Sequence, residues 1–144
     1  MKTSTLLRIA SVITFLYFAG HTAGMPWTPG EGPAEMAVIE AMKANRFEVI
    51  GSSRTYWDFY FGFGVIISVL QLAQAVVLWQ LGSLAKTDAT RLRPIIATFF
   101  AAFVANAFLG WMYFFAIPVV MAIAISICLG LAFVAAGKRY SQRQ

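Results

Sequence analysis

Hydrophobic positions along this chain gather into three long stretches that contain no Lys, Arg, Asp or Glu. The stretches cover residues 9–30, 59–85 and 94–137, and they are 22, 27 and 44 residues long. A helix that crosses the hydrocarbon of a membrane needs about 20 mainly apolar residues. The first two stretches are each long enough for one crossing, and the pattern predicts spanning helices over about 5–24 and 56–82.

The third stretch is too long for a single crossing. As one helix it would extend about 66 Å, which is more than twice the roughly 30 Å of hydrocarbon. We expect the chain to turn back between Tyr113 and Pro118, because Trp111 and Tyr113 are residues typical of a membrane interface and proline suits the first turn of a new helix. The pattern therefore predicts two spans here, at about 93–114 and 117–137.

Composition agrees with this pattern. Hydrophobic residues make up 60% of the 144 residues and charged residues only 12%, whereas soluble domains contain about 45–50% apolar and about 25% charged residues. The fold class we predict is an all-α membrane protein, in which residues 1–144 form a single transmembrane domain built as a bundle of four helices.

Residues 25–55, between the first and second spans, form the only long loop. Pro33 stands where a helix can begin, and Asn45 lies near its expected end. On a helix, one arc of this segment would be apolar and the other would carry Glu35, Glu40 and Lys43. We expect a short extracytoplasmic amphipathic helix that lies on the bilayer or covers the mouth of the bundle as a lid. Ser52 or Ser53 is the expected cap of the second span.

Basic residues predict the orientation of the spans. The loop 25–55 carries three of them, whereas eight lie at the N-terminus, in the connection between the second and third spans, and in the tail: Lys2, Arg8, Lys86, Arg91, Arg93, Lys138, Arg139 and Arg143. Because cytoplasmic loops are enriched in Lys and Arg, we expect both termini in the cytoplasm. The net charge of +5 then reflects topology, and the expected partner is the lipid bilayer and not a nucleic acid.

Small residues recur on three of the expected spans at the spacing of a helix face. Helices in lipid associate through close packing of such residues and through interhelical hydrogen bonds. These faces can pack within the chain, or against a second copy or another membrane protein, and the sequence leaves the choice open. The rows are Gly64, Ser68, Gln71 and Ala75; Thr98, Ala102, Asn106 and Gly110, beside Ala97, Ala101 and Ala105; and Ala122, Ser126 and Gly130.

Only two ionisable residues besides tyrosine and cysteine, His21 and Asp58, fall inside the expected spans without lying at a cytoplasmic end. Such residues are costly in a membrane and by default indicate function. Both are expected at the outer level, where they could meet. A candidate ligand-binding pocket opening outward would consist of His21, Asp58, Asn106, Tyr17, Arg54 and Tyr60. The structural alternative is that His21 is a hydrogen-bonded interfacial residue and that Asp58 is hydrated or paired with Arg54, four residues earlier.

No motif in the sequence carries recognisable chemistry. One histidine and one cysteine, His21 and Cys128, cannot provide bis-histidine haem ligation or a zinc site. The serine-hydrolase elbow, the phosphate-binding glycine-rich loop and the metalloprotease motif are absent from the sequence. We therefore assign no catalytic residue, no metal ligand and no cofactor, and whether the chain is an enzyme stays open.

The segment Phe15-Leu16-Tyr17-Phe18-Ala19-Gly20-His21 closes the first span and is followed by three more spans within about 140 residues. In this respect the chain resembles the small DoxX-like and related uncharacterised bacterial membrane proteins with four helices. The resemblance implies a four-helix bundle in a bacterial inner membrane and, for most members, no established reaction.

Two functional hypotheses follow. The first is a non-enzymatic, multi-pass inner-membrane component that associates with itself or with another membrane protein through its small-residue faces. The second is a binding protein or enzyme for a small lipophilic molecule in the outer-facing pocket around His21, Asp58 and Asn106.

Overall fold

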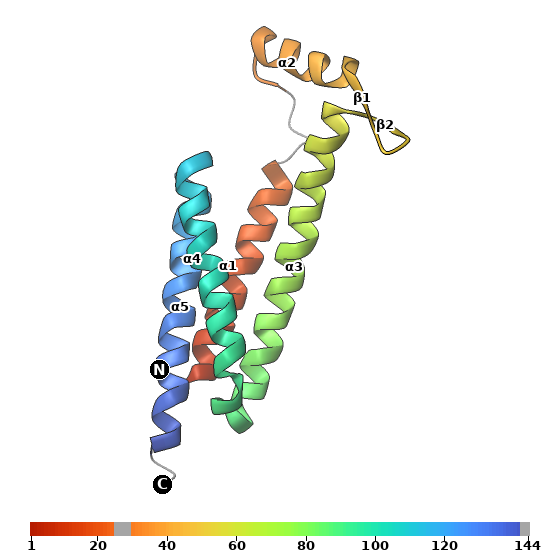
Figure 1. Cartoon of the computed structure of the whole chain (residues 1–144). Coiled ribbons are helices and arrows are strands. Elements are labelled where there is room, and N and C mark those ends of the chain that lie inside the picture. The colour runs from red at the N-terminus through yellow and green to blue at the C-terminus, as the bar shows by residue number, and fades with distance from the viewer. Residues whose placement is uncertain (25–29, 142–144) are drawn as a thin grey trace. The chain divides into compact units, whose positions relative to one another are not determined.

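Helices dominate the computed structural model, which describes residues 1–24 and 30–141, with side chains described as far as Gly137 (Figure 1). Four of the helices are long and apolar enough to cross a membrane, as the hydrophobic pattern predicts. In chain order the elements are α1 (Thr3–Gly24), α2 (Pro33–Ala44), β1 (Arg46–Val49), β2 (Ser52–Thr55), α3 (Tyr56–Asp88), the 3-10 turn η1 (Thr90–Leu92), α4 (Arg93–Tyr113) and α5 (Ala116–Ser141).

The turn inside the longest apolar stretch lies where the sequence predicts it. α4 ends at Tyr113 and α5 begins at Ala116, which puts Pro118 in the first turn of α5. The end of α3 differs from the prediction, because the helix continues to Asp88 instead of ending near residue 82. Its 33 residues extend about 50 Å by helix rise. The prediction ended the helix where the apolar residues end. A helix can continue through polar residues beyond that point.

The described chain divides into two compact units. Unit 1 comprises residues 1–17 and 71–144, and unit 2 comprises residues 18–70. In unit 1, α4 and α5 run antiparallel, side by side (Figure 1). Its core draws on all four long helices, with the following residues among those almost fully buried: Leu7, Leu78, Ile96, Phe103, Ile125 and Leu129.

Glycines allow α4 and α5 to approach closely. A Cβ atom added at Gly110 would lie 3.3 Å from a methyl carbon of Val119, and one added at Gly130 would lie 3.2 Å from the ring of Phe100. Contacts this short leave little room for a larger residue. The close packing that drives helix association in lipid is therefore present along this seam.

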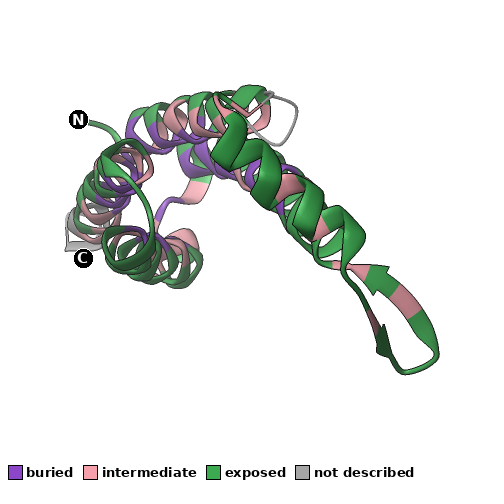
Figure 2. Cartoon of the chain, turned by 90° about the horizontal axis from the view of Figure 1, so that it is seen from above, coloured by how far each residue is buried: buried purple, intermediate pink, exposed green. Residues whose placement is uncertain are grey.

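Unit 2 contains α2 and a two-stranded hairpin, and neither has a buried residue (Figure 2). The helix begins at Pro33 and is followed by Asn45 as its C-cap, as predicted. The Lys43 ammonium group lies 5.4 Å from the ring centre of Trp57, at the start of α3, and 3.1 Å from a carboxylate oxygen of Glu40. The contact with Trp57 attaches the end of α2 to the beginning of α3, and the ion pair with Glu40 lies within α2.

The hairpin of β1 and β2 was not predicted from the hydrophobic pattern. Its strands pair antiparallel from Arg46 with Thr55 to Val49 with Ser52. The two turn residues both have positive φ, 48° at Ile50 and 74° at Gly51, which is the backbone of a tight hairpin turn. Isoleucine is an unusual residue at such a position. The pair Ile-Gly lacks the Asn-Gly signature that makes such turns recognisable in a sequence.

The predicted cap of α3 was wrong. Ser52 and Ser53 lie in β2, and the cap is Thr55, whose Oγ1 accepts a hydrogen bond from the backbone N–H of Asp58 at 3.0 Å. In return, the Asp58 carboxylate accepts a hydrogen bond from the backbone N–H of Thr55 at 2.8 Å. This reciprocal pair is a capping box. The serines cannot cap the helix because the strand continues past them.

Candidate functional site

His21, near the end of α1, is tied to α3 by a hydrogen bond. Its Nε2 lies 3.0 Å from the carbonyl oxygen of Gly64. Since a carbonyl can only accept, Nε2 carries the proton in this pair. Next to it, Thr22 donates to the Ser68 hydroxyl at 2.9 Å, and Ser68 donates to the same Gly64 carbonyl at 3.3 Å. Two polar side chains, His21 and Ser68, thus bond to one backbone carbonyl of α3, and Thr22 is linked to it through Ser68.

Asp58 has a different partner from His21. Its carboxylate caps α3 at Thr55, and its side chain is exposed. Gly64, to which His21 is bonded, lies six residues further along α3, about 9 Å away by helix rise. In the structure, each of these two ionisable residues therefore satisfies a backbone group of its own.

Arg54 is not paired with Asp58 as a residue four positions earlier on one helix. Arg54 lies on β2, because α3 begins only at Tyr56. Its guanidinium donates to the carbonyl oxygen of Ser53 at 2.8 Å. Within the described ranges, no ion pair joins Arg54 to Asp58.

The remaining residues of the predicted pocket have separate surroundings. Tyr60 is exposed, with its ring centre 5.6 Å from that of Trp57. Tyr17 is half-buried against the hydrophobic core of unit 1. Asn106 is exposed on α4. The grouping of all six residues into one pocket stays a prediction.

Two of the three small-residue rows pack against other helices of the same chain. On α3, Gly64, Ser68 and Ala75 are buried, and the Ala75 carbonyl accepts a hydrogen bond of 2.7 Å from Ser11 of α1. On α5, Ala122 and Ser126 are buried. Intrachain helix packing, which the sequence could not distinguish from packing against a second copy, therefore accounts for these two rows.

The row on α4 is different, because most of it is exposed. Only Gly110 is buried, against α5. We call the exposed small residues of this helix the α4 face: Thr98, Ala101, Ala102 and Ala105, with Asn106 at its edge. The buried residues of α4 recur at intervals of seven, Ile96, Phe103 and Gly110, and at about 100° per residue the centre of the α4 face lies on the opposite side of the helix.

Exposed positions on the other helix of this hairpin are large. On α5 the side chains that face outward include Ile123, Ile127, Leu131 and Val134. Bulky aliphatic side chains pack readily against lipid chains, whereas small residues let another helix approach closely. The α4 face therefore differs from the exposed surface of α5 in the property that governs helix association.

Asn106 adds a polar group at the edge of the α4 face. Among the residues that the structure describes, its side-chain amide has no hydrogen-bond partner. The hydroxyl of Thr98, by contrast, is satisfied by the Pro94 carbonyl at 3.1 Å. A primary amide offers both donors and an acceptor, and leaving it unpaired in hydrocarbon is unfavourable.

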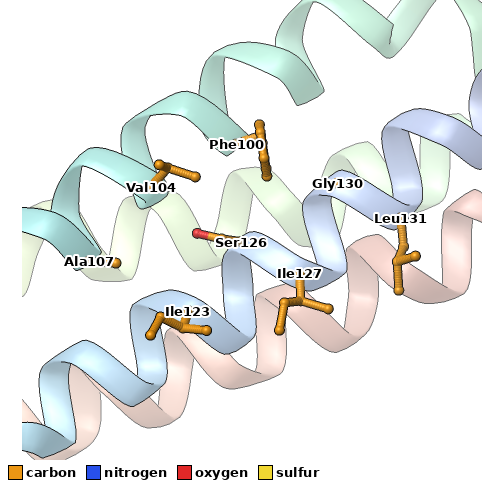
Figure 3. A pocket seen from close by; sticks show the side chains of 8 residues that line it. All are labelled: Phe100, Val104, Ala107, Ile123, Ser126, Ile127, Gly130 and Leu131. Atoms are coloured by element: carbon orange, nitrogen blue, oxygen red, sulfur yellow. The ribbon is translucent and has the colours of Figure 1, made fainter.

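A groove of about 460 Å³ runs along the seam between α4 and α5 (Figure 3). Phe100, Val104 and Ala107 line it from α4, and Ile123, Ser126, Ile127, Gly130 and Leu131 line it from α5. Its one hydroxyl, on Ser126, donates to the Ala122 carbonyl at 2.8 Å. None of the six residues of the predicted pocket lines this groove, and it offers no convergent polar groups for a substrate.

Residues 1–24 and 30–137 contain no cluster of three or more His, Cys, Asp or Glu side chains that could hold a metal ion. Comparison with protein-family models, with curated proteins and with solved structures finds no match to this chain.

Proposed function

We propose that this protein is a non-enzymatic membrane component that pairs with a second copy of itself through the α4 face. One observation carries the proposal. The small-residue rows of α3 and α5 are buried within the chain, whereas Thr98, Ala101, Ala102 and Ala105 of α4 are exposed. In lipid, a group of exposed small residues lets another helix approach closely.

Asn106 favours a second copy over an unrelated partner. Two identical amides can donate to and accept from one another, so a symmetric pair of α4 helices would satisfy both. A buried asparagine of this kind also fixes the register of two helices. Pairing would remove the unpaired amide from hydrocarbon, where it is unfavourable.

The orientation and location proposed for this dimer in the membrane rest on the sequence. We propose that both termini face the cytoplasm, because eight of the eleven basic residues lie at the N-terminus, in the connection between the second and third spans, and in the tail. Location in a bacterial inner membrane follows from the resemblance to the DoxX-like proteins. The exposed helix α2 would then lie outside, where its apolar arc can rest on the bilayer.

Self-association can be measured on the full chain in lipid vesicles, by energy transfer between donor-labelled and acceptor-labelled copies. Ala101→Leu with Ala105→Leu adds bulk to the α4 face. Overpacking costs about 1–3 kcal/mol, so the dissociation constant should rise roughly fivefold to 150-fold. Ala73→Leu makes one such change at an exposed position of α3 and should leave association unchanged. A monomeric wild-type chain, or equal loss in both variants, would contradict the proposal.

A further inference from the structure

Arg8 and Arg93 are held in similar ways at the same end of unit 1. This end combines the start of α1, the end of α3, the start of α4 and the end of α5 (Figure 1). Each arginine reaches across to a neighbouring helix and lies against an aromatic ring and a glycine one turn further along that helix. We call these two places the arginine seats.

The first seat is formed by α3. The Arg8 guanidinium lies 4.7 Å from the ring centre of Trp79 and donates to the Ser83 hydroxyl at 3.4 Å. A Cβ atom added at Gly82 would lie 2.9 Å from Cγ of Arg8 and 3.2 Å from the carbonyl oxygen of Ser4. Glycine at this position therefore gives the aliphatic stem of Arg8 room to cross α3.

The second seat is formed by α5. The Arg93 guanidinium lies 4.4 Å from the ring centre of Phe133. A Cβ atom added at Gly137 would lie 3.3 Å from Cζ of Arg93. Both seats therefore place the flat guanidinium against a ring face, an arrangement that lysine does not reproduce.

Neither guanidinium has a carboxylate partner in the described part of the chain. The Nε atoms of Arg8 and Arg93 are both buried and lack a hydrogen-bond partner there. The only acidic residue of unit 1, Asp88, is paired with Arg91 at 3.1 Å. Two guanidinium groups are thus partly withdrawn from solvent without a counter-charge, which is unfavourable unless an anion binds them.

The residues around the two arginine seats indicate which anion would bind there. The same end carries the exposed residues Lys2, Lys86 and Arg91. It also marks the boundary of the apolar stretches that begin at residues 9 and 94. At that boundary in a membrane, the abundant anions are the phosphate groups of lipids, and a guanidinium fork matches phosphate geometry.

We propose that the two arginine seats are binding sites for the phosphate groups of anionic phospholipids, one lipid at each seat. The aromatic ring covers one face of the guanidinium, and the glycine leaves room for the stem. The phosphate oxygens would accept from Nη hydrogens that the protein does not use; at Arg8, one Nη2 hydrogen is already donated to Ser83. These sites do not require self-association, and they lie on α1, α3, α4 and α5 within unit 1.

Native mass spectrometry of the full chain in detergent, with phosphatidylglycerol or phosphatidylcholine added, tests this proposal. The wild type should retain two phosphatidylglycerol molecules and no specifically bound phosphatidylcholine. Arg8→Gln and Arg93→Gln should each retain one, with affinity at the altered seat reduced roughly tenfold or more. Lys86→Gln removes one positive charge from the same end without touching a seat, and it should retain both lipids.

Three outcomes would overturn the proposal. If Lys86→Gln loses as much phosphatidylglycerol as the arginine variants, the lipid is attracted by charge alone. If the wild type retains phosphatidylcholine as well as phosphatidylglycerol, the sites have no preference for an anionic headgroup. Retention of inorganic phosphate in place of the lipid, in a lipid-free sample, would assign the seats to free phosphate. If a glutamine variant fails to fold, Arg8→Lys and Arg93→Lys can replace it. They keep the positive charge but lose the planar guanidinium, so they should bind phosphatidylglycerol less tightly than the wild type.

Discussion

The carbonyl oxygen of Gly64 on α3 accepts a hydrogen bond from Nε2 of His21 on α1, across 3.0 Å. His21→Ala should destabilise the protein by about 1 kcal/mol, the typical contribution of one interhelical hydrogen bond in a membrane protein. His21→Gln offers an amide donor of similar reach and should recover part of the loss. Thermal unfolding in mild detergent measures both. If His21→Ala unfolds at the wild-type temperature, the bond contributes nothing.

The candidate ligand pocket around His21 makes a different prediction for the same variants. If a lipophilic ligand binds there, it should raise the unfolding temperature of the wild type but not of His21→Ala or Asp58→Asn. Stabilisation that is unchanged in both variants would remove the pocket from consideration and leave His21 as a structural residue.

The capping box at the start of α3 should stabilise that end of the helix. Thr55→Ala removes the hydroxyl that accepts from Asp58, and a lost cap typically costs about 1 kcal/mol. Amide hydrogen exchange should therefore become faster in the first turn of α3, at residues 56–60. Ser52→Ala is the control, because Ser52 lies in β2 and does not cap the helix. Equal effects of the two changes would contradict this assignment.

Gly82 and Gly62 lie on the same helix in different surroundings. A Cβ atom at Gly82 would come 2.9 Å from Arg8, whereas one at Gly62 would have nothing within 4 Å. Gly82→Ala should therefore destabilise the protein by about 1–3 kcal/mol through overpacking, and Gly62→Ala should be neutral or slightly stabilising because alanine favours the helix. Unfolding midpoints of the two variants decide this, and the reverse order would be evidence against the contact between α1 and α3.

The proposed orientation predicts which residues a membrane-impermeant thiol reagent can reach. In a Cys128→Ala background, a cysteine at Glu35 on α2 should react from outside the cell, whereas one at Lys86 should react only after the membrane is opened. Labelling of both positions from the same side would contradict the four-span topology, since an odd number of crossings would have to separate them.

The sequence predicts the four long helices well because a membrane imposes its own length scale on apolar segments. The turn between Tyr113 and Ala116 follows from that length and from Pro118. The hairpin could not be predicted in this way. The alternation of polar and apolar residues in Arg46–Val49 is only four residues long, Ser52–Thr55 is polar throughout, and Ile50-Gly51 is not a common turn pair. The end of α3 was missed because the helix passes beyond the apolar residues.

Contacts between side chains were less accessible from the sequence. Small-residue rows are recognisable by their spacing, but only burial distinguishes Ser126, which packs inside, from Ala101, which does not. The arginine seats correspond to a weaker pattern in the sequence, a glycine one turn after an aromatic residue. It occurs at Gly82 after Trp79 and at Gly137 after Phe133. That spacing is common in apolar helices and becomes meaningful only once an arginine is seen to lie across it.

Disulfide cross-linking along α4 in native membranes is the most direct test of pairing through the α4 face. With Cys128 replaced by alanine, single cysteines would be placed at each position from Thr98 to Phe108 and oxidised. Cross-linked dimers should be strongest at Ala101, Ala102 and Ala105 and weak at Phe100 and Val104, which line the groove beside α5. Cross-linking that is absent at every position, or that peaks at Phe100 and Val104, would contradict the account.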